Sequence, residues 1–207
     1  MKLIWHGHSC FELVSSLGSA VFDPYEPGSV PGLGELKLEA DMVLCSHGHR
    51  DHGYLEGVKL SGRSCGLKVE TVESFHDEVK GRKRGGNLIH IVDAGDMRFV
   101  HLGDLGHPLS REQLERLGRV DVLMIPVGGF YTIDGREAIS TVKKINPRIT
   151  VPMHYRGAGF GYSEISTAED FLKGAENVKY YGGNVLEPEK VRGRETAVLS
   201  LSGILTW

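Results

Sequence analysis

Several short runs typical of β-strands end at a histidine or an aspartate, and this recurrence constrains the fold more than any other feature of the sequence. The runs cover residues 21–22, 44–46, 72–75, 100–103 and 151–153, and they lead to Asp23, His47, His76, Asp104 and His154. Side chains at the ends of neighbouring strands converge on one rim of a sheet, where loops can hold a metal and a substrate. Five such endings predict a metal site at a sheet edge.

The densest group of candidate ligands is the stretch CSHGHRDHG at residues 45–53. It places His47, His49, Asp51 and His52 directly after an apolar run. Alone, this stretch is also compatible with a solvated surface turn. Imidazole suits zinc, iron or manganese, and an aspartate can bridge two metal ions. With the later strand ends, five histidines and two aspartates suffice for a dinuclear site.

The remaining pattern predicts strands first and mixed helices and strands later. We expect strands at residues 2–5, 11–14, 20–22, 42–46, 67–72, 122–126, 149–152, 178–181 and 197–201, and a hairpin from residues 87–93 and 97–102. Helices are expected after Ser110, which suits an N-cap, at 136–144 and at about 167–175, where Ser166 and Glu169 have capping-box spacing. These elements predict an α/β fold of layered sheets covered by helices.

Length and charge limit the classes of function. The 207 residues fit one domain, residues 1–207, and the net charge of −3 is too small for the positive field that nucleic-acid binding demands. Three unpatterned cysteines favour a reducing compartment, and no apolar stretch is long enough to span a membrane. We therefore expect a cytoplasmic protein that acts on a small-molecule substrate.

The ordered motifs resemble one known family. The motifs GHSCFEL and FDPY precede the HxHxDH signature at residues 47–52. The motifs SFHDE, HLGDLGH, PVGGFYTID and VPMHY follow it, in the expected order. This set resembles the metallo-β-lactamase superfamily, in the compact branch that includes proteins similar to ascorbate-6-phosphate lactonase and N-acyl-phosphatidylethanolamine phospholipase D. The resemblance implies a four-layer αβ/βα sandwich with the site at one edge.

The resemblance also implies a role for each candidate ligand. The first metal would be held by His47, His49 and His76, the second by Asp51, His52 and His154, and both by the bridging Asp104. Asp23 and His8 would support these ligands from behind. Two zinc ions per chain are expected, with manganese or iron as alternatives, and His49 stands where oxygen-reducing diiron members carry a glutamate.

The implied activity is hydrolysis by a metal-bound hydroxide of an ester, lactone, amide or phosphodiester bond. Asp51 can also orient the hydroxide or accept its proton, and His107 can protonate a leaving group if it faces the pocket. The alternatives are an iron-binding redox protein of the same fold and a metal-binding module without catalysis. No GxSxG motif offers a competing serine nucleophile.

Three residues are candidate substrate ligands. Arg82 and Arg84 lie in the basic run KGRKRGG after His76 and would favour a phosphate or carboxylate, unless the run is only a solvated turn. Tyr155 follows His154 directly and can line the pocket or pack in the core. The short interval between His52 and His76 predicts a shallow pocket wall.

Overall fold

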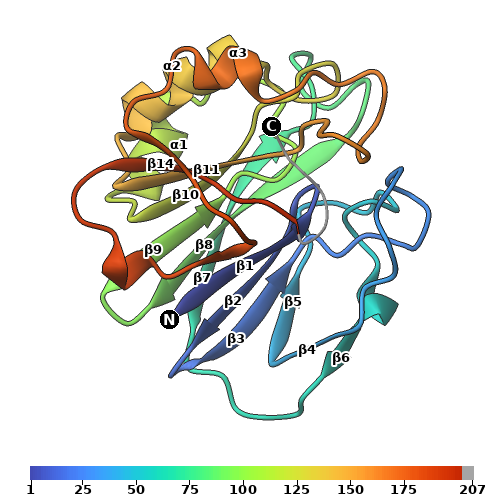
Figure 1. Cartoon of the computed structure of the whole chain (residues 1–207), viewed down its shortest axis with the longest axis vertical. Coiled ribbons are helices and arrows are strands. Elements are labelled where there is room, and N and C mark those ends of the chain that lie inside the picture. Colours follow the sequence, from blue (N-terminus) through green and yellow to red (C-terminus); the bar gives the residue numbers. More distant parts are fainter. Residues whose placement is uncertain (202–207) are drawn as a thin grey trace.

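Two β-sheets lie face to face in the computed structural model, which describes residues 1–201 (Figure 1). The first sheet has the order β13-β1-β2-β3-β5, formed by β13 (Val185–Leu186), β1 (Lys2–Gly7), β2 (Cys10–Ser15), β3 (Gly18–Phe22) and β5 (Met42–Leu44). The second has the order β12-β14-β11-β10-β9-β8-β7, formed by β12 (Val178–Tyr180), β14 (Glu195–Val198), β11 (Ile149–Met153), β10 (Val122–Pro126), β9 (Met97–His101), β8 (Gly86–Ala94) and β7 (Lys68–Phe75). The expected hairpin is the antiparallel pair β8 and β9.

Alternation along the first sheet explains how it is buried on both faces. Phe11 and Phe22 point into the main hydrophobic core, which also contains residues of the seven-stranded sheet. Cys10 and Val21, their neighbours in sequence, point the other way into a second apolar cluster. Successive side chains of a strand point to opposite faces, so both faces of this sheet must be covered.

Three helices cover the outer face of the seven-stranded sheet (Figure 1): α1 (Arg111–Leu117), α2 (Gly135–Ile145) and α3 (Glu169–Leu172). Ser110 caps α1 in a capping box, as its sequence predicts, and Asp134 does the same for α2. The capping box expected at Ser166 is wrong, because α3 has only four residues and begins after Ala168, whose side chain forms no cap.

A different layer covers the outer face of the five-stranded sheet. It consists of a two-stranded sheet, β4 (Leu38–Ala40) and β6 (Val58–Leu60), with the short helix η1 (Leu55–Gly57) and the loop that contributes Tyr25 and Val30 to the second cluster. The layered α/β class is confirmed, but in residues 1–201 the α-helices lie over the other sheet only. The three prolines in residues 24–34 disfavour a helix in this loop.

The pairing pattern brings six strand ends to one edge. β1 and β3 are both antiparallel to β2, and β5 is parallel to β3, so these three strands run in one direction. β7 and β9 are both antiparallel to β8, and β9, β10 and β11 are parallel, so β7, β9 and β11 also share a direction. Within each sheet these strands therefore end on one side, and the close contact of Asp104 with His52 joins the ends of the two sheets.

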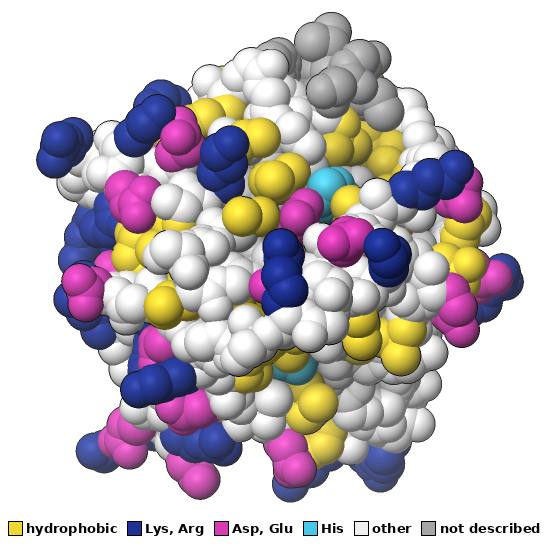
Figure 2. Space-filling model, turned by 90° about the horizontal axis from the view of Figure 1, so that it is seen from below, with side chains coloured by type: hydrophobic (Ala, Val, Ile, Leu, Met, Phe, Trp, Pro, Cys, Tyr) yellow, Lys and Arg dark blue, Asp and Glu magenta, His cyan; other side chains and the backbone are white. Residues whose placement is uncertain are grey.

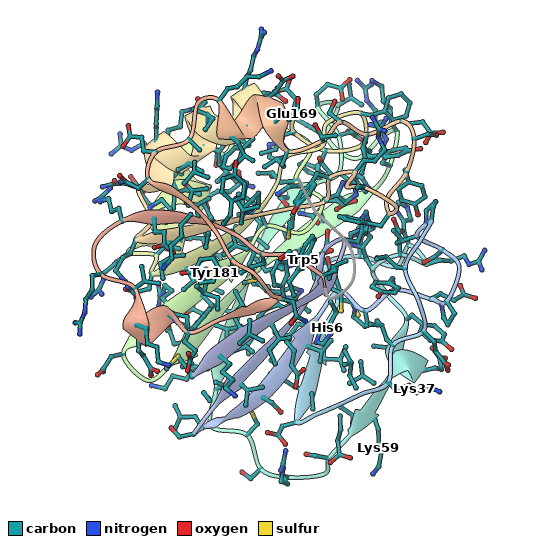
Figure 3. The ribbon with its side chains drawn as sticks, in the orientation of Figure 1. Trp5, His6, Lys37, Lys59, Glu169 and Tyr181 are labelled. Atoms are coloured by element: carbon teal, nitrogen blue, oxygen red, sulfur yellow. The ribbon has the colours of Figure 1, made fainter. Side chains whose placement is uncertain are left out.

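The rest of the described chain completes the core and the surface. Trp5 lies inside the molecule, whereas Lys37 and Lys59 project from the side of β4 and β6 (Figure 3). Basic and acidic side chains are intermixed on the face seen from below (Figure 2). The short helix η2 (Pro188–Lys190) precedes β14.

Among residues 1–201, no helix is both long enough and apolar enough to cross a membrane. The last six residues of the expected domain, 202–207, lie outside the described part.

Candidate metal centre

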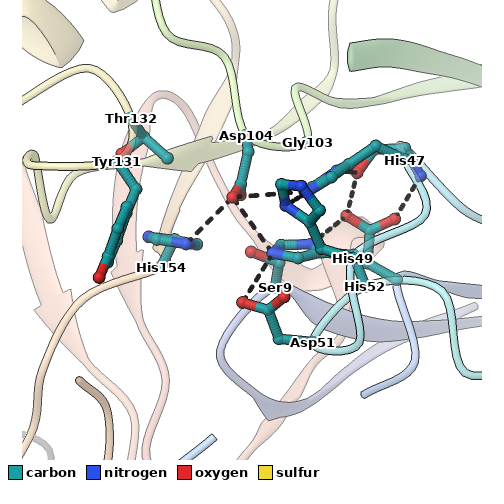
Figure 4. A network of polar contacts seen from close by, with 12 residues as sticks. Ser9, His47, His49, Asp51, His52, Gly103, Asp104, Tyr131, Thr132 and His154 are labelled. Carbon is teal, nitrogen blue, oxygen red and sulfur yellow. Dashed lines mark hydrogen bonds and ion pairs between the residues drawn. The ribbon is translucent and has the colours of Figure 1, made fainter. Parts of the chain in front are cut away.

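The predicted ligands meet at the edge where the six strands end (Figure 4). His76 and His154 directly follow β7 and β11, Asp104 follows β9, and the loop after β5 carries the remaining four: His47, His49, Asp51 and His52. Their ligand atoms form overlapping groups within which every atom lies within 4.8 Å of the others. The groups are His47, His49 and His76; His8, Asp51, His52 and His154; and His47, His52 and Asp104.

Asp104 lies between the first two groups. Its Oδ2 atom is 3.1 Å from His76 Nε2, 3.2 Å from His52 Nε2 and 3.2 Å from His154 Nε2. Ligand atoms about 2.0–2.1 Å from one zinc ion at tetrahedral angles are ~3.3 Å apart. The observed separations therefore match the spacing of ligands around bound metal, and the position of Asp104 suits a bridging carboxylate.

One buried carboxylate orients a histidine in each group. Asp23 Oδ2 accepts a hydrogen bond from His52 Nδ1 at 2.8 Å and another from Ser46 Oγ at 2.6 Å. Because the Ser46 hydroxyl donates to Asp23, its oxygen is left to accept from His47 Nδ1, 2.9 Å away. With a proton kept on Nδ1 in this way, both histidines would offer Nε2 to a bound metal, as metal-binding histidines require.

Backbone groups fix two further ligands. His76 Nδ1 lies 3.1 Å from the carbonyl oxygen of Tyr131, to which it can donate while Nε2 faces Asp104. The backbone N–H of Asp104 donates to Asn87 Oδ1 at 2.9 Å. His49 differs from the others, because its Nδ1 lies 3.0 Å from His47 Nε2, so Nδ1 is the atom that it would offer to a metal.

Burial keeps several imidazoles neutral. Burial and the neighbouring His52 lower the pKa of His47 to about 3, and burial and the neighbouring His154 lower the pKa of His8 to about 4. Both side chains are therefore unprotonated near neutral pH. Neutral imidazole is the form that binds metal, so these groups need not release a proton first.

The Asp104 carboxylate, unlike these neutral imidazoles, favours its charged form. Burial opposes ionisation of Asp104, but His154 and His52 hold its pKa well below the usual range. Burial also opposes protonation of His52, yet Asp104, Asp23 and Asp51 raise its pKa well above the usual value. Several carboxylates around one imidazolium create a negative site, which a divalent cation can neutralise in place of the proton.

Strained backbone positions cluster at the centre. His8, Asp23 and His154 all have positive φ, at 50°, 44° and 51°. Side chains other than glycine rarely adopt this left-handed conformation, and such residues concentrate at functional sites. The turn at each strand end directs the side chain into the centre, where ordinary alternation would not place it.

The structure does not bring two predicted residues to the metal cluster. His107 lies against the outer edge of β7, where its Nε2 accepts the backbone N–H of Phe75 and its Nδ1 lies 2.9 Å from the carbonyl oxygen of Pro108. Tyr155 is buried in the core, with its ring 5.6 Å from that of Trp5. The left-handed backbone of His154 turns Tyr155 away from the centre.

The two predicted arginines lie in different environments. Arg84 donates to the carbonyl oxygen of Phe130 at 3.0 Å, and its guanidinium lies 5.6 Å from the centre of the Tyr131 ring. It therefore contacts the loop whose Tyr131 carbonyl oxygen also lies next to His76. Arg82 is exposed and donates to the carbonyl oxygen of Val79 within its own loop.

Sequence reasoning missed two side chains of the centre. Ser46 links Asp23 to His47, and its only signal in the sequence is its place immediately before the first ligand. Tyr162 donates to the carbonyl oxygen of Ser29 at 2.7 Å, and its hydroxyl also lies 3.2 Å from Asp51 Oδ2. It comes from a loop with no motif that would have marked it.

Known proteins are similar to this chain in sequence. The β-lactamase superfamily domain matches residues 2–154. A UPF0173 metal-dependent hydrolase of Thermoplasma acidophilum is 29% identical over 75% of this chain and 83% of its own, and a UPF0173 protein of Pyrococcus abyssi is 32% identical over 79% and 88%.

A solved structure extends the likeness to the whole fold. A Thermotoga maritima protein, proposed to be a zinc-dependent hydrolase of the metallo-β-lactamase superfamily, superposes with a TM-score of 0.78 at 33% identity. The match covers 97% of this chain and 98% of that one. The family match, the relatives and the shared fold lead to one conclusion: this chain belongs to the metallo-β-lactamase superfamily of metal-dependent hydrolases.

Proposed function

We propose that the chain is a dinuclear zinc hydrolase that cleaves an ester, lactone, amide or phosphodiester bond in a small anionic substrate. The observation that carries the proposal is the pair of donor groups on either side of Asp104. The first metal would be held by His47, His49 and His76, and the second by Asp51, His52 and His154. The donor set suits zinc, and manganese or iron remain alternatives that metal supply would decide.

The two halves of the centre differ in access to solvent, and this difference supports catalysis. His49 is exposed, whereas His52 and His154 are buried. A catalytic zinc site keeps an open position for water or substrate, and a structural site is closed. The first half therefore fits the position at which substrate is bound.

Bound metal ions would supply an activated water and polarise the bond under attack. The side chains of the chain would position the reacting groups and move the proton. Asp51 has one carboxylate oxygen close to both His52, at 3.5 Å, and the Tyr162 hydroxyl, at 3.2 Å. Held in this way, Asp51 could accept the proton of the attacking water, while Asp104 remains between the two halves.

Arg84 and the loop at Tyr131 support an anionic substrate. The guanidinium is anchored by the carbonyl of Phe130 and lies over the ring of Tyr131, whose own carbonyl contacts His76. An arginine held beside a metal-binding residue can bind a phosphate or carboxylate through two parallel hydrogen bonds. Arg82, although exposed, could join it when a substrate is present.

The test is to prepare metal-free protein, restore zinc or manganese, and screen ester, lactone, amide and phosphodiester substrates. We expect two metal ions per chain, hydrolysis in at least one class, and its loss in His154→Ala. His6→Ala is the matched control, because His6 pairs with Glu12 outside the donor groups. Binding of metal without hydrolysis in any class, and without an effect of His154→Ala, would refute catalysis.

Metal analysis separates the two alternatives. An iron redox protein would be purified with iron and an optical spectrum, whereas zinc gives none. A metal-binding module without catalysis would bind metal and hydrolyse nothing. The free thiols of Cys10, Cys45 and Cys65 support our proposal that the protein acts in the cytoplasm, where thiols remain reduced.

A further inference from the structure

His8 is a buried imidazole for which neither the fold nor the seven proposed ligands account. Its side chain has no exposed surface, and its Nε2 lies 3.3 Å from Asp51 Oδ2. Its ring centre is 4.1 Å from that of His154 and 5.1 Å from that of His52. His8 therefore lies among the proposed donors of the second metal.

The ring nitrogens of His8 have fewer partners than those of a structural histidine. Within residues 1–201, Nδ1 has no hydrogen-bond partner, and the partner of Nε2 is the carboxylate of Asp51, itself a proposed ligand, 3.3 Å away. His101, by comparison, is equally buried, but its Nε2 lies 2.9 Å from the carbonyl oxygen of Ser9 and its Nδ1 accepts the N–H of Gly103. A buried polar group with few partners is costly, and the ligand atom of His8 also lies within 4.8 Å of those of Asp51, His52 and His154, which suits a shared metal ion.

The backbone fixes the direction in which His8 points. Its carbonyl oxygen accepts the indole N–H of Trp5 at 3.0 Å and the backbone N–H of His154 at 3.3 Å. Gly7, at φ 104°, and His8, at φ 50°, form the strained turn that makes these contacts. One of these hydrogen bonds ties His8 directly to a proposed ligand, His154, and the other ties it to Trp5, so the backbone that carries the imidazole is fixed from two sides.

We propose that His8 binds the second metal directly, as a further ligand beside Asp51, His52 and His154. This inference rests on the proposed function, because it requires that the centre hold metal. With Asp104, the second half would then have five protein donors and little room for water. The first half, with its exposed His49, would keep the open position, so the second metal would bind more tightly and the first would exchange and carry substrate.

Nuclear magnetic resonance of the protein loaded with ¹¹³Cd²⁺ tests this bond without measuring activity. The protein would be labelled with ¹⁵N in its histidine rings, and His8→Gln would identify the His8 signals by their loss. We expect the His8 Nε2 resonance to be split by coupling to ¹¹³Cd, as the Nε2 resonances of His52 and His154 are. His6 should show no splitting, and it provides the internal control.

The outcomes separate the inference from the function on which it rests. Splitting of His52 and His154 without splitting of His8 would overturn the inference and leave the metal centre intact, with His8 only orienting Asp51. Absence of splitting in every histidine would overturn both. The decisive spectrum is that of the unmodified sequence, so the test survives even if His8→Gln fails to fold, because the split signals can be counted: six with His8 and five without it.

Discussion

Replacing Asp23 with asparagine should weaken metal binding at both halves of the centre while leaving every proposed ligand in place. The Asp23 carboxylate is fully buried and accepts three hydrogen bonds: from Ser46 N at 2.6 Å, Ser46 Oγ at 2.6 Å and His52 Nδ1 at 2.8 Å. Asparagine can keep the bond from Ser46 N, but its amide NH₂ would face the two remaining donors.

The consequence is a change of tautomer at His52. With a donor opposite Nδ1, His52 would move its proton to Nε2, the atom that faces Asp104 and the second metal. Ser46 Oγ would also turn, which removes the acceptor for His47 Nδ1. Loss of such outer partners reduces metal affinity about 10- to 100-fold, equivalent to about 1.4–2.7 kcal/mol per site.

Competition for zinc against a chromophoric chelator measures this effect. Asp121→Asn is the matched control, because Asp121 is also buried and accepts a backbone N–H, from Arg98, far from the donor groups. Ser46→Ala separates the two halves, because it removes the contact with His47 but leaves the bond from His52 to Asp23. A folded Asp23→Asn protein that binds both zinc ions with unchanged affinity would refute the proposed role of Asp23.

Three further outcomes test other parts of the structure. His107→Ala should reduce the free energy of unfolding by about 1 kcal/mol, the value of the hydrogen bond to Phe75. It should change kcat less than twofold. A large fall in kcat with unchanged KM would instead establish His107 as a proton donor. Arg84→Ala should raise KM for an anionic substrate about tenfold or more, whereas Arg82→Ala should have a smaller effect, and equal effects would contradict the separate environments of the two arginines. Backbone N–H groups hold the pKa of Asp77 at about 2 although burial opposes this, so Asp77 stabilises the fold fully above about pH 4 and loses this contribution as the pH falls towards 2. The difference in urea stability between wild type and Asp77→Asn should therefore be smaller near pH 3 than at pH 7, and a constant difference would contradict this explanation.

The parts of the fold that the sequence predicts well are those with a local cause. The strands that lead to Asp23, His47 and His154 have apolar, branched residues that alternate or run together, and their ends coincide with the predicted ends to within a few residues. The convergence of these ends needed the assumption of a shared direction, which the observed pairing supplies within each sheet. The family resemblance then named the same residues.

The parts that could not be predicted depend on tertiary context. β4 and β6 have three residues each and pair only with one another, so no periodic signal marks them. His107 contacts Phe75 because β7 is the last strand of its sheet, and strand order is not written in a local pattern. Tyr155 was expected near the pocket because it follows His154 in sequence. The left-handed turn at His154 breaks the regular alternation of side chains, so Tyr155 does not line the pocket.

Three of the residues with left-handed backbone lie at the centre or directly behind it. His8, Asp23 and His154 each occupy a left-handed conformation that costs roughly 1 kcal/mol or more, which is a considerable part of the 5–15 kcal/mol by which a domain is stable. No turn requires these residue types there, since glycine would adopt the same φ without strain. Each carries a side chain that belongs to the donor groups or to the carboxylate that supports them. Asp23 shows that this backbone conformation does not by itself make a ligand, so His8 is counted among the ligands because its ligand atom lies within 4.8 Å of those of Asp51, His52 and His154.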